Sequence, residues 1–249
     1  MLCMDPITTT FVRRLRDRDE AAWFELWEAF GPVIRAQLSK WGRGRIQAET
    51  IRDLTQETLA ELSGSIDRFD PDRGVRFSTW LLAIAKHVLG DEIDRRMAGK
   101  RGGGRRAASL DESFMGAADE PDHDSEYERE VFHAKVLAAL RATEQAEPFL
   151  HFQVFRMRVL DGVPGKEVAV QLGISEPTVS RHLARVRDRL RERLRESIAT
   201  FSFTDEERDE ATLAGLESDD LLFDDAIGEI HREQVTRVAR RIRDGKAGA

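Results

Sequence analysis

Apolar side chains recur every three or four residues along most of the chain, a spacing that places them on one face of an α-helix. Three such stripes lie in the first part of the sequence, at residues 23–41, 51–69 and 77–93. A shorter amphipathic stretch at residues 11–16 precedes them. We therefore expect a compact helical domain over residues 1–97.

The same periodicity returns over residues 127–195 and recurs in two later segments, 204–216 and 220–243. Thr204 followed by Glu207 fits a capping box, which predicts that a helix begins at the first of these segments. No segment keeps the alternation of apolar and polar residues that is typical of a half-exposed strand. The chain is predicted to be all-α.

Residues 98–126 interrupt the helical pattern. This stretch is first rich in glycine and arginine and then strongly acidic, and it has no apolar period. We expect a flexible linker here. The predicted order is a helical domain at residues 1–97, the linker, a second helical domain at residues 127–196, and an acidic helical extension at residues 197–249.

Composition excludes several classes of protein. The single cysteine, Cys3, rules out a disulfide framework and a cysteine-based zinc site, and it favours a reducing, cytoplasmic setting. No apolar run is long enough to cross a membrane, and the first ten residues lack the basic lead and apolar core of a signal peptide. The six histidines are scattered and form no metal-binding motif, so we expect neither a metal nor another cofactor.

The formal net charge of −7 seems to disfavour a nucleic-acid partner. The charges are unevenly distributed, however. Basic residues gather at 95–106 and 181–195, and acidic residues gather at 111–130 and 204–225. A polyanion responds to charges within about a Debye length, roughly 8 Å at physiological salt. The sign of the local charge, and not the net charge, therefore decides whether a nucleic acid can bind.

Residues 162–190 have the pattern of a DNA-binding helix-turn-helix. Pro164 suits the start of a helix, Gly173 allows the turn, and Ser175 can cap the second helix. The alternative is an ordinary amphipathic helix packed on its neighbour. We expect Val168, Ala169, Leu172, Ile174, Val179, Leu183, Val186 and Leu190 to face inward. We expect Thr178, Ser180, Arg181, His182 and Arg185 to face outward from the recognition helix, close to Ser175.

A second basic face follows the stripe at residues 77–93. Phe77 and Trp80 lie on the apolar side and are expected in the core. The polar side carries Arg76, Lys86, His87, Arg95 and Arg96, which could follow a phosphate backbone. A solvated basic surface would show the same spacing.

Enzyme signatures are poor, because the sequence GVPGKE lacks the first glycine and the hydroxyl residue of a phosphate-binding loop. The chain is not expected to be an enzyme.

The stretch FDPDRGVRFSTWLLAIAKHVLGDEIDRR resembles region two of bacterial sigma factors, and DLTQETLAEL resembles the helix that precedes it. The helix-turn-helix resembles region four. The short plan, without regions one and three, is similar to the extracytoplasmic-function (ECF) group. This resemblance implies a factor that binds core RNA polymerase and directs it to promoter DNA.

The resemblance also implies roles for particular residues. Asp53, Gln56 and Glu57 match the face that contacts polymerase. Arg76, Lys86, His87, Arg95 and Arg96 match the side that meets the minus-ten element. Ser175, Thr178, Ser180, Arg181, His182 and Arg185 match the reader of the minus-thirty-five element. Two departures matter: Ala83 and Ile84 stand where housekeeping members carry a tryptophan pair. Strand opening would then depend on the loop before the minus-ten helix.

The remaining segments allow more than one interpretation. The acidic linker residues could mimic nucleic acid within the polymerase. The segment Asp219–Asp225, DDLLFDD, could cover a basic DNA-binding face, or the extension could be a solubilising appendage. A separate anti-sigma factor is a further possible partner. The alternative functions are a stand-alone helix-turn-helix regulator whose first domain senses a signal or dimerises, and a polymerase-binding protein without promoter specificity.

Overall fold

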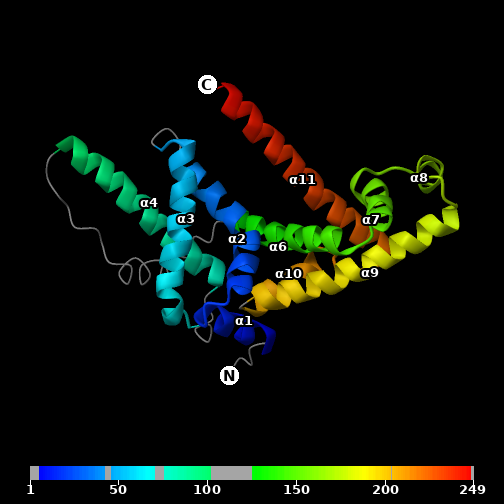
Figure 1. Ribbon diagram of the computed structural model, residues 1–249, viewed down its shortest axis with the longest axis horizontal. Coiled ribbons are helices and arrows are strands. Elements are labelled where there is room, and N and C mark those ends of the chain that lie inside the picture. Colours follow the sequence, from blue (N-terminus) through cyan, green and yellow to red (C-terminus); the bar gives the residue numbers. More distant parts are fainter. Residues whose placement is uncertain (1–5, 43–45, 71–75, 102–124, 203, 248–249) are drawn as a thin grey trace. The chain divides into compact units, whose positions relative to one another are not determined.

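The fold was analysed in a computed structural model that describes residues 6–42, 46–70, 76–101, 125–202 and 204–247 (Figure 1). Every regular element in these ranges is helical, and no strand occurs among them, which confirms the all-α prediction. The chain divides into two compact units. The first comprises residues 1–134 and 199–205, and the second comprises residues 135–198 and 206–249.

The first unit is built on four helices and one 3₁₀ turn. Asp19 caps the second helix, because its carboxylate accepts hydrogen bonds from the amides of Ala21 and Ala22 at 2.9 and 3.2 Å. The helices are α1 (Pro6–Arg16), α2 (Glu20–Trp41), α3 (Ala48–Ser65) and α4 (Phe77–Arg101), with the 3₁₀ turn at Ile66–Arg68.

The three predicted apolar stripes meet in one core. Phe77 and Trp80 are buried, as expected, and Phe69 stacks on Trp80 with ring centroids 5.0 Å apart. This contact makes Trp80 a packing residue and leaves its ring no exposed face for a base. Ala83 and Ile84 are also buried in α4, so neither side chain is presented to DNA.

Two later helices complete this core. The first turns of α6 (Ser125–Ala146) contribute Tyr127 and Val131, and the end of α9 (Glu176–Phe201) contributes Phe201. The Tyr127 hydroxyl donates a hydrogen bond to the carbonyl of Ser78 at 2.8 Å, so the buried phenol is satisfied.

The second unit contains the rest of α6, most of α9, and the C-terminal extension from residue 206 onward. Its remaining elements are α7 (Phe149–Phe155), a π-helical segment (Arg156–Leu160), α8 (Gly165–Leu172), α10 (Asp205–Leu213) and α11 (Asp220–Ala247). Helix α10 begins directly after Thr204, as the capping pattern predicts.

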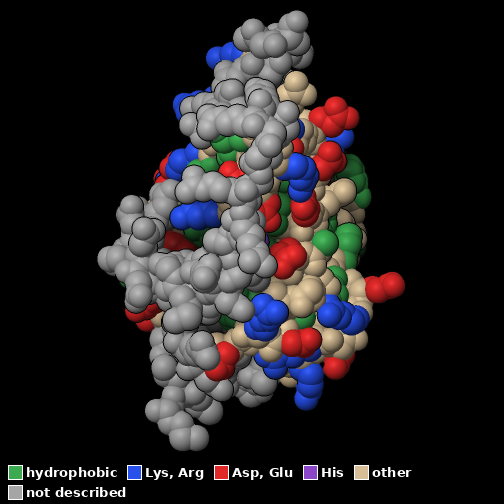
Figure 2. Space-filling view, turned by 90° about the vertical axis from the view of Figure 1, so that its left-hand side faces the viewer, with side chains coloured by type: hydrophobic (Ala, Val, Ile, Leu, Met, Phe, Trp, Pro, Cys, Tyr) green, Lys and Arg blue, Asp and Glu red, His purple; other side chains and the backbone are tan. Residues whose placement is uncertain are grey.

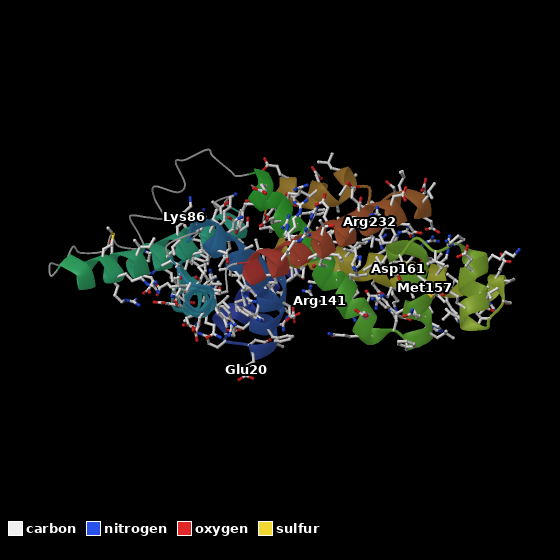
Figure 3. All side chains as sticks on the ribbon, turned by 90° about the horizontal axis from the view of Figure 1, so that it is seen from above. Glu20, Lys86, Arg141, Met157, Asp161 and Arg232 are labelled. Carbon is white, nitrogen blue, oxygen red and sulfur yellow. The ribbon has the colours of Figure 1, made fainter. Side chains whose placement is uncertain are left out.

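Helix α11 packs against the π-helical segment through its first three turns. Phe223, Ile227 and Ile230 are buried. At Gly228 a Cβ would lie 3.0 Å from the carbonyl oxygen of Val159, so glycine permits a close approach of the two backbones. Figure 3 labels Met157 and Asp161 in or beside the π-helical segment and Arg232 on α11. The extension is therefore a packed part of the second unit.

A buried ion pair joins the extension to α6. Lys135 Nζ lies 3.4 Å from Glu207 Oε1, and each side chain is 1% exposed. Removing one member of such a buried pair is costly, because the other charge then loses the attraction that offsets its removal from water.

The two compact units begin and end at other residues than the predicted domains do. The predicted domain boundaries stay a prediction. Within the predicted linker, α4 continues to Arg101 and α6 begins at Ser125. Residues 102–124, with most of the acidic side chains expected to mimic nucleic acid, lie outside the described residues. Among the described helices, none is long and apolar enough to cross a membrane.

We expect Glu207→Ala to lower the free energy of unfolding by about 3–5 kcal/mol, because it removes the counter-charge 3.4 Å from the buried Lys135 ammonium. Glu206→Ala changes the neighbouring exposed carboxylate and should shift stability far less. Urea unfolding followed by circular dichroism measures both variants. Equal, small effects of the two substitutions would contradict the view that this pair is energetically important.

Candidate nucleic-acid interface

The second unit contains the predicted helix-turn-helix. Helix α8 ends at Gly173, whose φ of +65° is the left-handed conformation that glycine favours. The amide of Ile174 donates back to the carbonyl of Ala169 at 3.0 Å and closes the turn. Ser175 then precedes α9, and its hydroxyl accepts a long hydrogen bond from the Thr178 amide at 3.4 Å.

The recognition helix α9 has one buried and one exposed side. Val179, Leu183, Val186 and Leu190 are buried, as predicted. On the other side, Ser180, Arg181 and Arg185 are exposed, whereas Thr178 and His182 are partly exposed. Arg181 Nη2 donates to Thr178 Oγ1 at 3.1 Å, and that oxygen lies 2.8 Å from the Ser175 hydroxyl.

His182 differs from the outward orientation expected for it. Its ring stacks on the ring of His151 from α7, with centroids 4.1 Å apart and planes inclined by 27°. Burial lowers the pKa of His182 below its ordinary value of 6.5, and the positive charges of His151, Arg181 and Arg185 act in the same direction. These effects favour the neutral form of the imidazole beside the two arginines.

The predicted minus-ten residues of the first unit lie on α4 or just before it. Lys86 is exposed, and its ammonium lies 5.6 Å from the centre of the Trp41 ring (Figure 3). His87 is partly buried and places Nε2 3.6 Å from Asp91 Oδ2. Of the loop expected to capture an extruded base, Asp70 to Gly74, all but Asp70 lies outside the described residues.

The three arginines of this set are each paired with a carboxylate. Arg76 Nη1 lies 3.1 Å from Glu128 Oε2. Glu92 receives both Arg95 and Arg96, at 2.7 and 2.6 Å. On the face shown in Figure 2, blue and red side chains are likewise interspersed. A phosphate that approached these arginines would have to share or replace the carboxylates.

The predicted polymerase-binding residues share one face of α3. Asp53, Gln56 and Glu57 are all exposed, whereas Leu54 and Thr55 between them are buried. Glu57 Oε1 lies 3.9 Å from Arg95 Nη2, so the acidic face of α3 adjoins the end of the basic set on α4.

Sequence analysis did not identify several of the carboxylates that pair with these arginines and with Arg185. The spacing of Glu92 to Arg95 and Arg96, three and four residues, is a recognisable helical ion-pair signal. Glu128 and Glu147 have no such signal, because they lie 52 residues from Arg76 and 38 residues from Arg185 along the chain.

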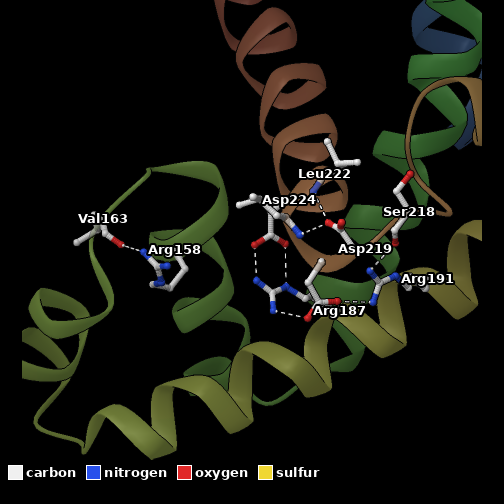
Figure 4. A network of polar contacts seen from close by, with 10 residues as sticks. Arg158, Val163, Arg187, Arg191, Ser218, Asp219, Leu222 and Asp224 are labelled. Carbon is white, nitrogen blue, oxygen red and sulfur yellow. Dashed lines mark hydrogen bonds and ion pairs between the residues drawn. The ribbon is translucent and has the colours of Figure 1, made fainter.

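The acidic start of α11 is bound to two arginines of α9 (Figure 4). Arg187 Nε donates to Asp224 Oδ1 at 2.8 Å, and its Nη1 donates to Asp220 Oδ2 at 2.9 Å. Arg191 bonds Asp220 Oδ1 at 2.9 Å and lies 4.4 Å from the centre of the buried Phe223 ring. The hydrogen bond from Arg191 and the charge of Arg187 lower the pKa of Asp220.

These arginines are not on the predicted DNA-reading side. Arg187 follows Arg185 by two residues, which is about 200° around a helix. Among the described residues, no hydrogen bond or ion pair joins the extension to Arg181 or Arg185. In this structure, Asp220 and Asp224 therefore engage the flank of α9, and the predicted reading side keeps its exposed arginines. The described residues also hold no cluster of three or more side chains suited to a metal ion.

The comparisons with known families agree with this geometry. The family Sigma-70 region 2 matches residues 26–98, which run from α2 to α4. The family Sigma-70, region 4, matches residues 151–190, which contain the helix-turn-helix. The chain belongs to the sigma-70 family of transcription initiation factors.

Individual relatives indicate the group of sigma factors to which this chain is similar. The ECF RNA polymerase sigma factor RpoE of Cereibacter sphaeroides is 29% identical over 179 residues, covering 72% of this chain and 90% of that protein. The ECF RNA polymerase sigma factor SigC of Mycobacterium tuberculosis is 31% identical over 142 residues, covering 55% of this chain and 65% of that protein. The predicted ECF type of this sigma factor is confirmed.

We expect acidification to destabilise the second unit through His182. Because the folded-state pKa lies below 6.5, the penalty is absent above that pH and grows as the pH falls through 6.5. His182→Gln should therefore lose less unfolding free energy than the wild type between pH 7.5 and 5.5, measured by urea unfolding. Parallel losses in both proteins would show that His182 does not titrate as argued.

Proposed function

We propose that this sigma factor binds core RNA polymerase, delivers it to promoters, and helps to open the duplex without covalent chemistry. The observation that carries the proposal is the presence of region-two and region-four families, in the expected order, on one chain. A stand-alone regulator would need the second of these but not the first. The place of action would be the cytoplasm, with polymerase and promoter DNA as partners.

The division of labour follows from the two interfaces. The exposed Asp53, Gln56 and Glu57 on α3 are suited to a basic partner surface on the polymerase. The cations along α4, with Arg76, would follow the phosphate backbone near the minus-ten element, giving affinity and salt dependence. The exposed side of α9 would read base edges of the minus-thirty-five element in the major groove.

The extension is proposed to brace region four. The buried side chains of Phe223, Ile227 and Ile230, the ion pairs of Arg187 and the Lys135–Glu207 pair all join it to the second unit. This arrangement supports neither a loose appendage nor a cover over Arg181 and Arg185. Cutting the chain after Ser197 would remove all of these contacts, so single substitutions are the better test of a regulatory role.

Run-off transcription with purified core polymerase, with and without this chain, tests the main proposal on a pooled promoter library. New start sites that require both components are the expected result. Arg181→Ala should then reduce discrimination at one minus-thirty-five position by about 1–3 kcal/mol, while polymerase binding stays unchanged. Arg193→Ala, near the other end of α9, is the control. Loss of polymerase binding in Arg181→Ala would contradict the separation of the two interfaces.

The bracing role predicts that Phe223→Ala lowers the free energy of unfolding by about 3–5 kcal/mol and reduces transcription. Leu221→Ala removes a neighbouring exposed side chain and should change stability by less than about 0.5 kcal/mol. Thermal unfolding and run-off transcription of both variants provide the measurement. Increased transcription from Phe223→Ala would instead identify the extension as an inhibitor.

A further inference from the structure

A carboxylate lies behind the recognition helix at the junction of α6 and α7. The amide of Glu147 donates to the carbonyl of Thr143 at 3.0 Å, which continues the helical bonding of α6 and fixes the backbone. The Glu147 side chain is only 5% exposed. A carboxylate with so little access to water needs positively charged or donating partners.

Recognition-helix side chains supply these partners. Arg185 Nε donates to Glu147 Oε2 at 3.2 Å, and Arg189 Nε lies 3.8 Å from Oε1. His151 Nδ1 lies 3.5 Å from the same carboxylate, and the His151 ring stacks on His182. Glu147 is thus bonded directly to one predicted base-reading position, Arg185, and lies close to His151, whose ring stacks on a second, His182.

The contact with Arg185 uses only one edge of the guanidinium. Nε is bonded to Glu147, whereas Nη1 and Nη2 make no hydrogen bond to any described residue. The Arg185 side chain remains 58% exposed. The two terminal nitrogens form the pair of donors that matches N7 and O6 of guanine in the major groove.

We propose that Glu147 is a positioning residue for minus-thirty-five recognition. It holds Arg185 by Nε so that the terminal donors are presented together to a guanine, or to a phosphate if no guanine lies there. The inference rests on the proposed function of α9. A long arginine side chain that is ordered before binding loses less conformational freedom when it makes its specific contact.

The negative charge of Glu147 and its hydrogen bond to Arg185 should have opposite effects on DNA binding. The negative charge of Glu147 lies close to Arg185 and Arg189, so it weakens the general attraction of this surface for phosphate. Removing that charge should strengthen sequence-independent DNA binding. Removing the hydrogen bond should loosen Arg185 and weaken discrimination between bases. A residue with a merely structural role would not separate these two effects.

The experiment compares wild type with Glu147→Gln as full-length proteins in holoenzyme with core polymerase. Binding is measured on the preferred promoter, on its single-base minus-thirty-five variants, and on unrelated DNA. We expect the ratio of preferred to variant affinity to fall roughly tenfold, part of what a bidentate contact provides, while binding to unrelated DNA rises. Glu144→Gln, an exposed carboxylate one turn earlier in α6, is the charge-matched control and should leave the ratio unchanged.

A second background tests whether Arg185 transmits the effect. Arg185→Lys keeps the charge but cannot make the two-donor contact, so adding Glu147→Gln to it should cause no further loss of discrimination. An unchanged ratio in Glu147→Gln, or an equal loss in both backgrounds, would overturn the inference. If the wild-type holoenzyme itself does not distinguish minus-thirty-five variants, the proposed function of α9 fails instead.

Discussion

Burial of one apolar stripe of α9 is the constraint on which the recognition surface depends. Val179, Leu183, Val186 and Leu190 recur at the helical period, and their removal from water fixes the rotation of the helix. Arg181 and Arg185 are then necessarily exposed. Arg187 and Arg191 are placed at the edge of the buried stripe, where α11 binds them.

Across this acidic chain, arginine side chains are paired with nearby carboxylates. The arginines expected to meet DNA near the minus-ten element are paired with Glu92 or Glu128, and Arg185 is paired with Glu147. Such pairs hold long side chains in place but also compete with phosphate. Under the proposed function, binding to DNA exchanges one set of charge-assisted bonds for another, so affinity should depend on salt concentration and on the polymerase.

The extension shows how a segment that is weakly defined by its sequence gains its role from packing. Its acidic composition predicted either a cover for a basic face or a solubilising appendage. In the structure, Phe223 and Glu207 are both buried in the second unit, which supports the bracing role proposed above. The first three turns of α11 carry the apolar side chains that pack into the second unit, and the neighbouring aspartates bind the arginines of α9.

The sequence by itself determined the helices, their buried faces and the turn at Gly173, because helical period, capping and turn residues act over a few neighbouring positions. The resemblance to sigma factors came separately, from the motifs at residues 53–62, 69–96 and 162–190. The placement of the exposed residues Ser180, Arg181 and Arg185 followed from the same local pattern. Only the tertiary structure decided the partners of those side chains. The Glu147–Arg185, Arg76–Glu128 and Lys135–Glu207 pairs join residues 38, 52 and 72 positions apart, and His182 meets His151 across two helices. No local period records such pairings, because they depend on how separate helices pack against one another.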